Sequence, residues 1–193
     1  ALNFIFIISL PMIVYFIVFA KECIFFLSGT KFVPSTIPMQ IIMPTLLFIG
    51  LTNILGIQIL IPLGKERYVL YSTIVGALVD LILNAILIPQ FQSAGAAIGT
   101  LVAEFAVFIV QFILIDSDIR EMFKTFQVYK IVIAVIAGLL CSCWVKNTSL
   151  HVFFTLAISA IIFFPVYGIV LLLLKEQFIT EVKNNLLSKF KTH

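Results

Sequence analysis

The sequence has 193 residues, of which 62% are hydrophobic and only 11% are charged, and its mean hydropathy is +1.22. Soluble domains carry about 25% charged residues, so this composition excludes an ordinary water-soluble protein and indicates an integral membrane protein. The formal net charge of +3 does not indicate a nucleic-acid partner, because basic residues in a membrane protein first report its topology.

Several apolar runs reach the roughly 20 residues that a helix needs to cross the hydrocarbon layer, and none shows the alternation of a membrane β-barrel. We therefore predict an all-α fold: a polytopic membrane helical bundle with about six transmembrane helices. The predicted spans are 2–20, 38–61, 68–88, 94–115, 129–145 and 150–174. They make one transmembrane domain over 1–174, followed by a basic amphipathic tail over 175–193, which suits either an anionic leaflet or solvent.

The connections between these spans are short. Residues 21–36 are expected to form a turn or a short interfacial segment, and Lys65-Glu66-Arg67 a tight charged turn that makes span three antiparallel to span two. An uncharged break over 89–94 separates spans three and four. The charged stretch 116–130 is predicted to be an interfacial helix, with Asp118 as its N-cap.

Span three carries small and polar residues at four-residue intervals, which places Ser72, Gly76, Asp80 and Asn84 along one face of the helix. A carboxylate such as Asp80 costs about 2.5–3.5 kcal/mol at the bilayer centre, so we expect it to face a cavity or a polar partner.

Span four has a matching pattern. Gly95, Gly99 and Ala103 form a small-xxx-small stripe that favours close helix packing, while Thr100 and Glu104 lie four residues apart on a neighbouring face. Spans three and four are therefore predicted to pack as a hairpin with a shared polar side.

The two acids lie at comparable depths in antiparallel spans. Asp80 and Glu104 could share a proton or form half of a cation site lined by Asn84, Thr100 and Ser72. The alternative is that each acid is a protonated or hydrogen-bonded packing element. Asn53, Gln58 and Asn84 are likewise candidates for a substrate or ion path, or for hydrogen bonds between helices. These candidates are Asp80, Glu104, Asn84, Asn53, Gln58 and Thr100.

No catalytic residue set is visible, so we do not expect an enzyme. The sequence has no Ser-His-Asp, HExxH or glycine-rich phosphate motif. Its three cysteines form neither a disulfide framework nor a metal-ligand cluster, and no cofactor is expected.

Basic residues predict the orientation of the chain. Nine of the twelve Lys and Arg residues fall on one side of the six spans: Lys65, Arg67, Arg120, Lys124, Lys130, Lys175, Lys183, Lys189 and Lys191. The positive-inside rule puts that side, with the carboxyl terminus, in the cytoplasm.

Motifs between Leu55 and Glu104 carry a family resemblance. They are the stretch Gln58 to Gly64 with its Lys-Glu turn, the Asn84-xxx-Ile-Pro89 end of a span, the Gly95-Ala96-Ala97 restart and the closing Glu104. Over about residues 1–115 the chain resembles the polysaccharide flippase family (O-antigen and capsular repeat units) of the multidrug/oligosaccharidyl-lipid/polysaccharide exporter superfamily.

The resemblance implies most of the C-terminal lobe of a two-lobe exporter in the bacterial inner (plasma) membrane, working by alternating access. The implied substrate is a lipid-linked oligosaccharide, with a proton or sodium ion for coupling. Because the chain begins at Ala1 without methionine, we expect it to be a fragment. The resemblance implies an N-terminal lobe of the same protein as its partner, besides membrane lipids. The alternatives are a cation-coupled drug antiporter, a lipid II flippase, a membrane polymerase or acyltransferase of polysaccharide assembly, or a non-transporting membrane scaffold.

Overall fold

The computed structural model describes residues 2–116, 119–120, 128–148 and 151–174, and the regular elements within these ranges are all helical. Most of the predicted interfacial helix over 116–130, including Asp118, and the whole tail over 175–193 lie outside the described residues.

The helices follow one another with few connecting residues. They are α1 (Leu2–Val18), α2 (Ala20–Ser28), the 3₁₀ segment η1 (Thr30–Ser35), α3 (Thr36–Ile42), α4 (Thr45–Asn53), the π-helix η2 (Ile54–Leu60), α5 (Glu66–Leu114), α7 (Val128–Ser142), the 3₁₀ segment η3 (Cys143–Asn147) and α8 (Val152–Leu173).

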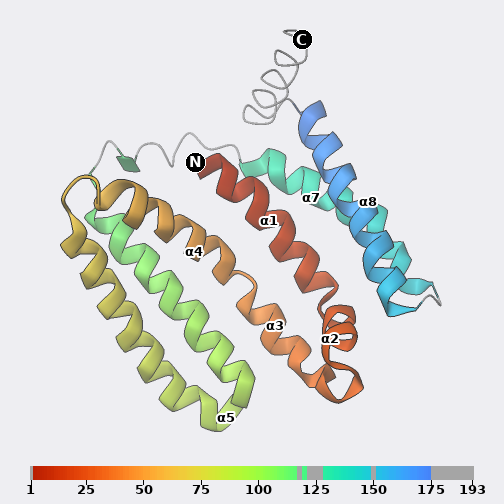
Figure 1. Cartoon of the computed structure of the whole chain (residues 1–193), viewed down its shortest axis with the longest axis horizontal. Coiled ribbons are helices and arrows are strands. Elements are labelled where there is room, and N and C mark those ends of the chain that lie inside the picture. Colours follow the sequence, from red (N-terminus) through yellow and green to blue (C-terminus); the bar gives the residue numbers. More distant parts are fainter. Residues whose placement is uncertain (1, 117–118, 121–127, 149–150, 175–193) are drawn as a thin grey trace.

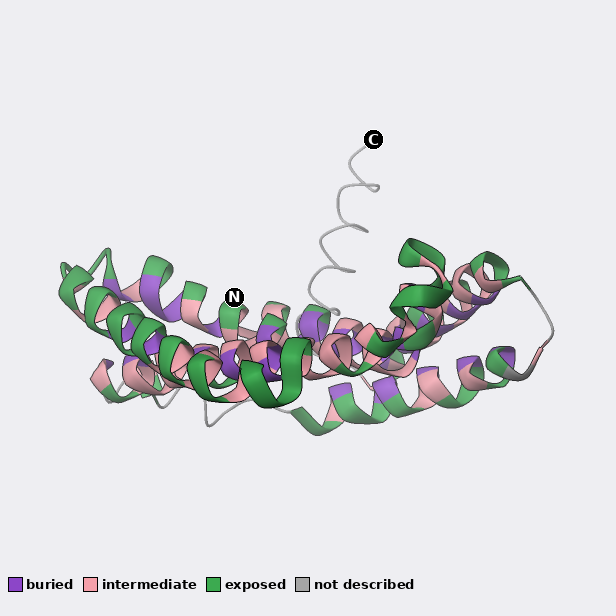
Figure 2. Ribbon diagram, turned by 90° about the horizontal axis from the view of Figure 1, so that it is seen from below, coloured by how far each residue is buried: buried purple, intermediate pink, exposed green. Residues whose placement is uncertain are grey.

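The helices stand side by side in a row that runs from the α5 hairpin through α4 with α3 and then α1 to α7 and α8 (Figure 1). Seen from the edge, the row is a thin layer whose buried residues lie where helices meet (Figure 2). Because successive long elements run antiparallel, the α4–α5 turn and the end of α8 lie along one edge of the row, the upper edge in Figure 1. The opposite edge holds α2, the hairpin turn and the α7–α8 connection.

Within the residues that the structure describes, three helices are long and apolar enough to cross a membrane: Glu66–Leu114, Val128–Lys146 and Val152–Leu173. The number rises to five if two bent pairs each count as one span, namely α1 with α2, bent by 74°, and Thr30–Ile42 with Thr45–Leu60, bent by 40°. The all-α prediction is confirmed. The count stays below the predicted six because predicted spans three and four both belong to α5.

The predicted break over 89–94 is wrong in its extent. Helical structure continues through Pro89, and Gln92 is the residue of α5 whose backbone leaves the helical region, with φ 51° and ψ −126°. A proline removes only one backbone donor, so a helix can run past it for a few residues. The reversal of the chain is therefore much tighter than the proline suggested.

The main apolar core joins α1, α7 and α8. Phe19, Ile131, Phe163 and Leu171 are fully buried in it. The Tyr15 hydroxyl fixes the contact between α1 and α8, since it lies 3.0 Å from both the Leu156 carbonyl oxygen and Ser159 Oγ. Each buried hydroxyl thus has a partner where water is absent, which specifies how these helices dock.

Lys146 holds the bend between α1 and α2. Its Nζ donates to the carbonyl oxygen of Val18 at 2.7 Å, lies 3.4 Å from Glu22 Oε1 and sits 5.3 Å from the centre of the Phe19 ring. A helix end leaves carbonyl groups without intrahelical partners, and a cation suits that end of the helix. The residues over 21–36, for which we predicted a turn or a short interfacial segment, are mainly helical. Lys146, which lies in the connection between α7 and α8, holds α2 in place.

Lys146→Met should loosen this bend. The substitution keeps the aliphatic stem but leaves the Val18 carbonyl and the Glu22 carboxylate without their donor, at a cost of about 1–3 kcal/mol in unfolding free energy. Thermal unfolding in detergent measures the loss, with Lys31→Met, at an exposed position of η1, as the matched control. Equal stability of the two variants would contradict a structural role for Lys146.

Candidate functional site

The α5 hairpin is closed by a turn with almost no free space. A Cβ atom added to Gly95 would overlap the Leu87 carbonyl oxygen and lie 2.5 Å from the Leu87 carbonyl carbon. These are backbone atoms of the opposite arm, so only glycine fits here. The first arm, residues 66–91, and the second arm, residues 93–114, are thereby held in contact from the turn onward.

The polar stripe of the first arm faces the second arm. Ser72 and Gly76 are buried in this contact, and Gln111 Nε2 donates to Ser72 Oγ at 3.1 Å. Gly76 leaves room for Val107, since an added Cβ would overlap the Val107 side chain. The far ends of the arms are joined by an ion pair of 2.7 Å between Lys65 and Asp116.

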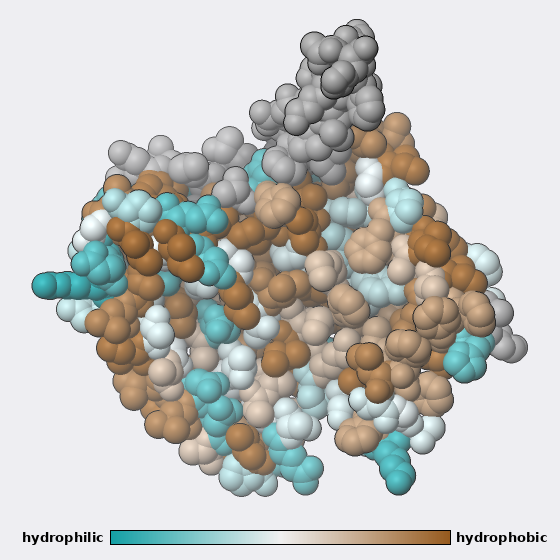
Figure 3. Space-filling view, in the orientation of Figure 1, coloured by the Kyte–Doolittle hydropathy of each residue, from teal (hydrophilic) through white to brown (hydrophobic). Residues whose placement is uncertain are grey.

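Near the middle of the hairpin the two arms leave a groove of about 240 Å³ between them. One wall comes from the first arm and the other from the second. The lining residues are Thr73, Gly76, Ala77, Asp80, Thr100, Ala103, Glu104 and Val107. Thr73 and Ala77 are exposed, so the groove opens at the surface of the hairpin, over which Figure 3 shows hydrophilic atoms between apolar ones.

Asp80 is held in place by its neighbour on the same helix. Asn84 Nδ2 donates to Asp80 Oδ2 at 3.0 Å, which directs the Asn84 carbonyl oxygen toward the second arm. Gly99 accommodates that oxygen, because an added Cβ would lie 2.5 Å from Asn84 Oδ1 and 3.5 Å from Asp80 Oδ1. Gly99 therefore leaves space both for the Asn84 carbonyl oxygen and for the close contact between the two arms.

Two oxygens of this pair are buried without a hydrogen-bond partner among the described residues: Asp80 Oδ1 and Asn84 Oδ1. Both oxygens can accept hydrogen bonds or bind hard cations, and the carboxylate oxygen can also take up a proton. Glu104 adds a third carboxylate or amide group on the opposite wall of the groove. No cluster of three or more His, Cys, Asp or Glu residues suited to a metal ion occurs in the described part of the chain.

The structure brings four of the six pathway candidates together. Asp80, Thr100 and Glu104 line the groove and Asn84 is bonded to Asp80. Asn53 and Gln58 lie apart from it, exposed on α4 and η2, and Asn53 Nδ2 donates to the Ile49 carbonyl oxygen of its own helix at 2.9 Å.

Sequence reasoning missed Thr73 and Ala77 as groove residues. Both belong to one helical face with Asp80, at spacings of four and three residues, so the same periodicity that selected Ser72 and Gly76 could have found them. The signal was weak because Ala77 is apolar and Thr73 is only mildly polar.

The long apolar helices and their exposed Leu, Ile and Phe side chains define a multi-pass α-helical membrane protein. A relative with the same broad description is an uncharacterized membrane protein of Methanocaldococcus jannaschii, 26% identical over 178 residues. The match covers 92% of this chain, and the chain spans only 35% of the relative's length. No family model matches the chain, and no solved structure matches it.

Proposed function

We propose that the chain forms most of one lobe of a two-lobe transporter, and that the α5 groove is part of its substrate or ion path. The observation that carries this proposal is the placement of Asp80 and Glu104 on facing walls of one groove inside an otherwise apolar hairpin. Intramembrane acids are costly, and where they occur they usually mark a pathway for substrates or ions.

The arrangement of the helices supports the same proposal. Each arm of α5 is long enough to cross the bilayer separately, which gives about six crossings with α1, the α3–η2 segment, α7 and α8. Broken helices such as α3–α4 with its 40° bend, and π-helical turns such as η2, are common at transport and functional sites. The rest of a longer protein would supply the opposite wall of the path.

The proposed substrate is a lipid-linked oligosaccharide exported for surface polysaccharide assembly in a cell membrane. This choice rests on the motif resemblance between Leu55 and Glu104, and a proton or sodium ion is the proposed coupling ion. The basic ends of the helices, including Lys65 and Arg67, would then face the cytoplasm together with the carboxyl terminus.

The test uses the full-length parent protein in a strain from which its gene has been deleted. The proposal expects loss of surface polysaccharide with accumulation of lipid-linked units on the inner side, and recovery when the wild-type gene is returned. If the deletion strain kept its surface glycan and became more sensitive to cationic drugs, we would conclude that the protein is a drug antiporter and does not transport the oligosaccharide. Loss of chain extension while single repeat units still reach the surface would indicate a polymerase.

A further inference from the structure

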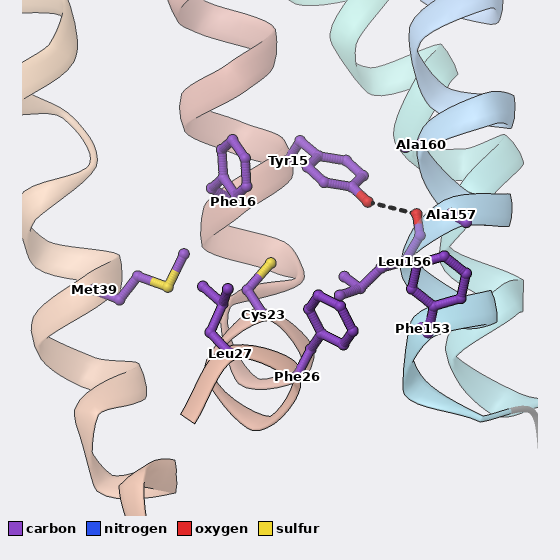
Figure 4. A pocket seen from close by; sticks show the side chains of 10 residues that line it. All are labelled: Tyr15, Phe16, Cys23, Phe26, Leu27, Met39, Phe153, Leu156, Ala157 and Ala160. Carbon is purple, nitrogen blue, oxygen red and sulfur yellow. Dashed lines mark hydrogen bonds between the residues drawn. The ribbon is translucent and has the colours of Figure 1, made fainter. Parts of the chain in front are cut away.

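A second cavity of about 390 Å³ lies far from the hairpin, between the α1–α2 bend, α3 and α8 (Figure 4). Its walls are apolar side chains, with Tyr15 and Phe16 from α1, Phe26 from α2 and Met39 from α3. The Tyr15 hydroxyl is turned away from the space and bonded to α8. A cavity of this size and character suits a hydrocarbon ligand.

The cavity follows the axis of α8. Phe153, Leu156, Ala157 and Ala160 line it at the spacing of one helical face and cover about 10 Å along the helix. The two alanines create the width, since the neighbouring residues of α8 are mostly Phe, Ile and Leu. A cavity lined by apolar side chains over this length of a membrane helix can hold part of one lipid chain.

The cavity reaches the end of the molecule where α2 turns by 74° from α1, because Cys23, Phe26 and Leu27 of α2 line it. Phe26 and Phe153 meet there with ring centres 5.7 Å apart, and Leu27 is 74% exposed. Trp144, which is 58% exposed, belongs to η3 in the connection between α7 and α8, and such aromatic residues mark the interface between membrane and water. The cavity thus runs from the interface into the apolar layer.

The charge at this end favours an anionic headgroup. Lys21 and Lys31 are exposed on α2 and η1. Glu22 is the one acidic residue in the segments at this end, which are 20–36, 143–148 and 151–153. Its Oε1 lies 3.4 Å from Lys146 Nζ. Lysines close to the membrane surface attract anionic lipids.

We propose that this cavity binds one hydrocarbon chain of an anionic membrane lipid, whose headgroup lies at Lys21 and Lys31. The site is separate from the α5 groove and does not depend on the transport proposal. It would join α2, α3 and α8 by filling the space between them with lipid rather than with side chains.

The test places a single tryptophan at the cavity wall. Phe16→Trp, combined with Trp144→Phe, is reconstituted in phosphatidylcholine vesicles that contain either brominated phosphatidylglycerol or brominated phosphatidylcholine as quencher. We expect a preference of about fivefold or more for the anionic quencher, the effect of one or two lysines at a membrane surface. Lys21→Gln with Lys31→Gln should remove this preference and leave quenching by both lipids.

Ile161→Trp is the matched control, because Ile161 is 71% exposed on the same helix and outside the cavity. It should show no headgroup preference. Ala157→Phe, which fills the cavity, should abolish the preference at Phe16→Trp. An equal preference at positions 16 and 161, or none at position 16, would overturn the proposal even if Ala157→Phe failed to fold.

Discussion

Gly95→Ala should open the α5 hairpin and lower the stability of the protein by about 3 kcal/mol, at the upper end of the cost of overpacking. The added methyl group would overlap the Leu87 carbonyl oxygen, and the other close atoms also belong to the backbone of the first arm. No side chain can turn aside to relieve the contact. The two arms must therefore separate near Gln92, which would widen the groove between Asp80 and Glu104.

Gly168→Ala is the control for this prediction, since no atom lies within 4 Å of an added Cβ there and the site is also inside a membrane helix. Thermal unfolding in detergent gives the stability difference. A disulfide between Gly76→Cys and Val107→Cys, whose Cβ atoms would lie 3.8 Å apart across the two arms, reports whether the arms remain aligned. If Gly95→Ala matched Gly168→Ala in both measurements, the tight turn would be refuted.

Glu104→Gln and Asp80→Asn should each reduce transport by the full-length parent about 5- to 150-fold, the usual range of a coupling free energy between two sites. An amide has nearly the shape of the acid but neither exchanges a proton nor carries a charge. The two residues face one groove, so the double variant should lose little more than the worse single variant.

Glu66→Gln provides the comparison, because it makes the same change on the same helix at an exposed position outside the groove. Export is measured at matched membrane expression. Full transport by both groove variants would mean that Asp80 and Glu104 only hold the arms together, and would remove the coupling argument.

Much of the hairpin could be predicted from the sequence, because one periodicity governs it. Residues four apart share a helix face, so Ser72, Gly76 and Asp80 had to lie together, and small residues at 99 and 103 had to mark the contact with a second helix. The long apolar runs likewise predicted α7 and α8 to within a few residues.

The features that escaped prediction depend on contacts between distant residues or on local backbone geometry. The role of Lys146 depends on Val18, which is 128 residues away in the chain. The π-helical turn at Ile54–Leu60 has no pattern that distinguishes it from α-helix. Asn53 and Gln58 seemed equivalent to Asn84, but polar residues in a span can satisfy their own helix, as Asn53 does.

Water access to the α5 groove is the measurement that bears most directly on the transport proposal. In the parent protein, with Cys23, Cys141 and Cys143 replaced by serine or alanine, single cysteines are placed at Thr73 or Thr100 in the groove and at Leu81, which is 67% exposed on the apolar outer face. If the groove is part of an aqueous path, a charged, membrane-impermeant thiol reagent should modify Thr73→Cys and Thr100→Cys and leave Leu81→Cys unmodified. Protection of the groove positions equal to that of Leu81→Cys would contradict the path and make the acids elements of packing.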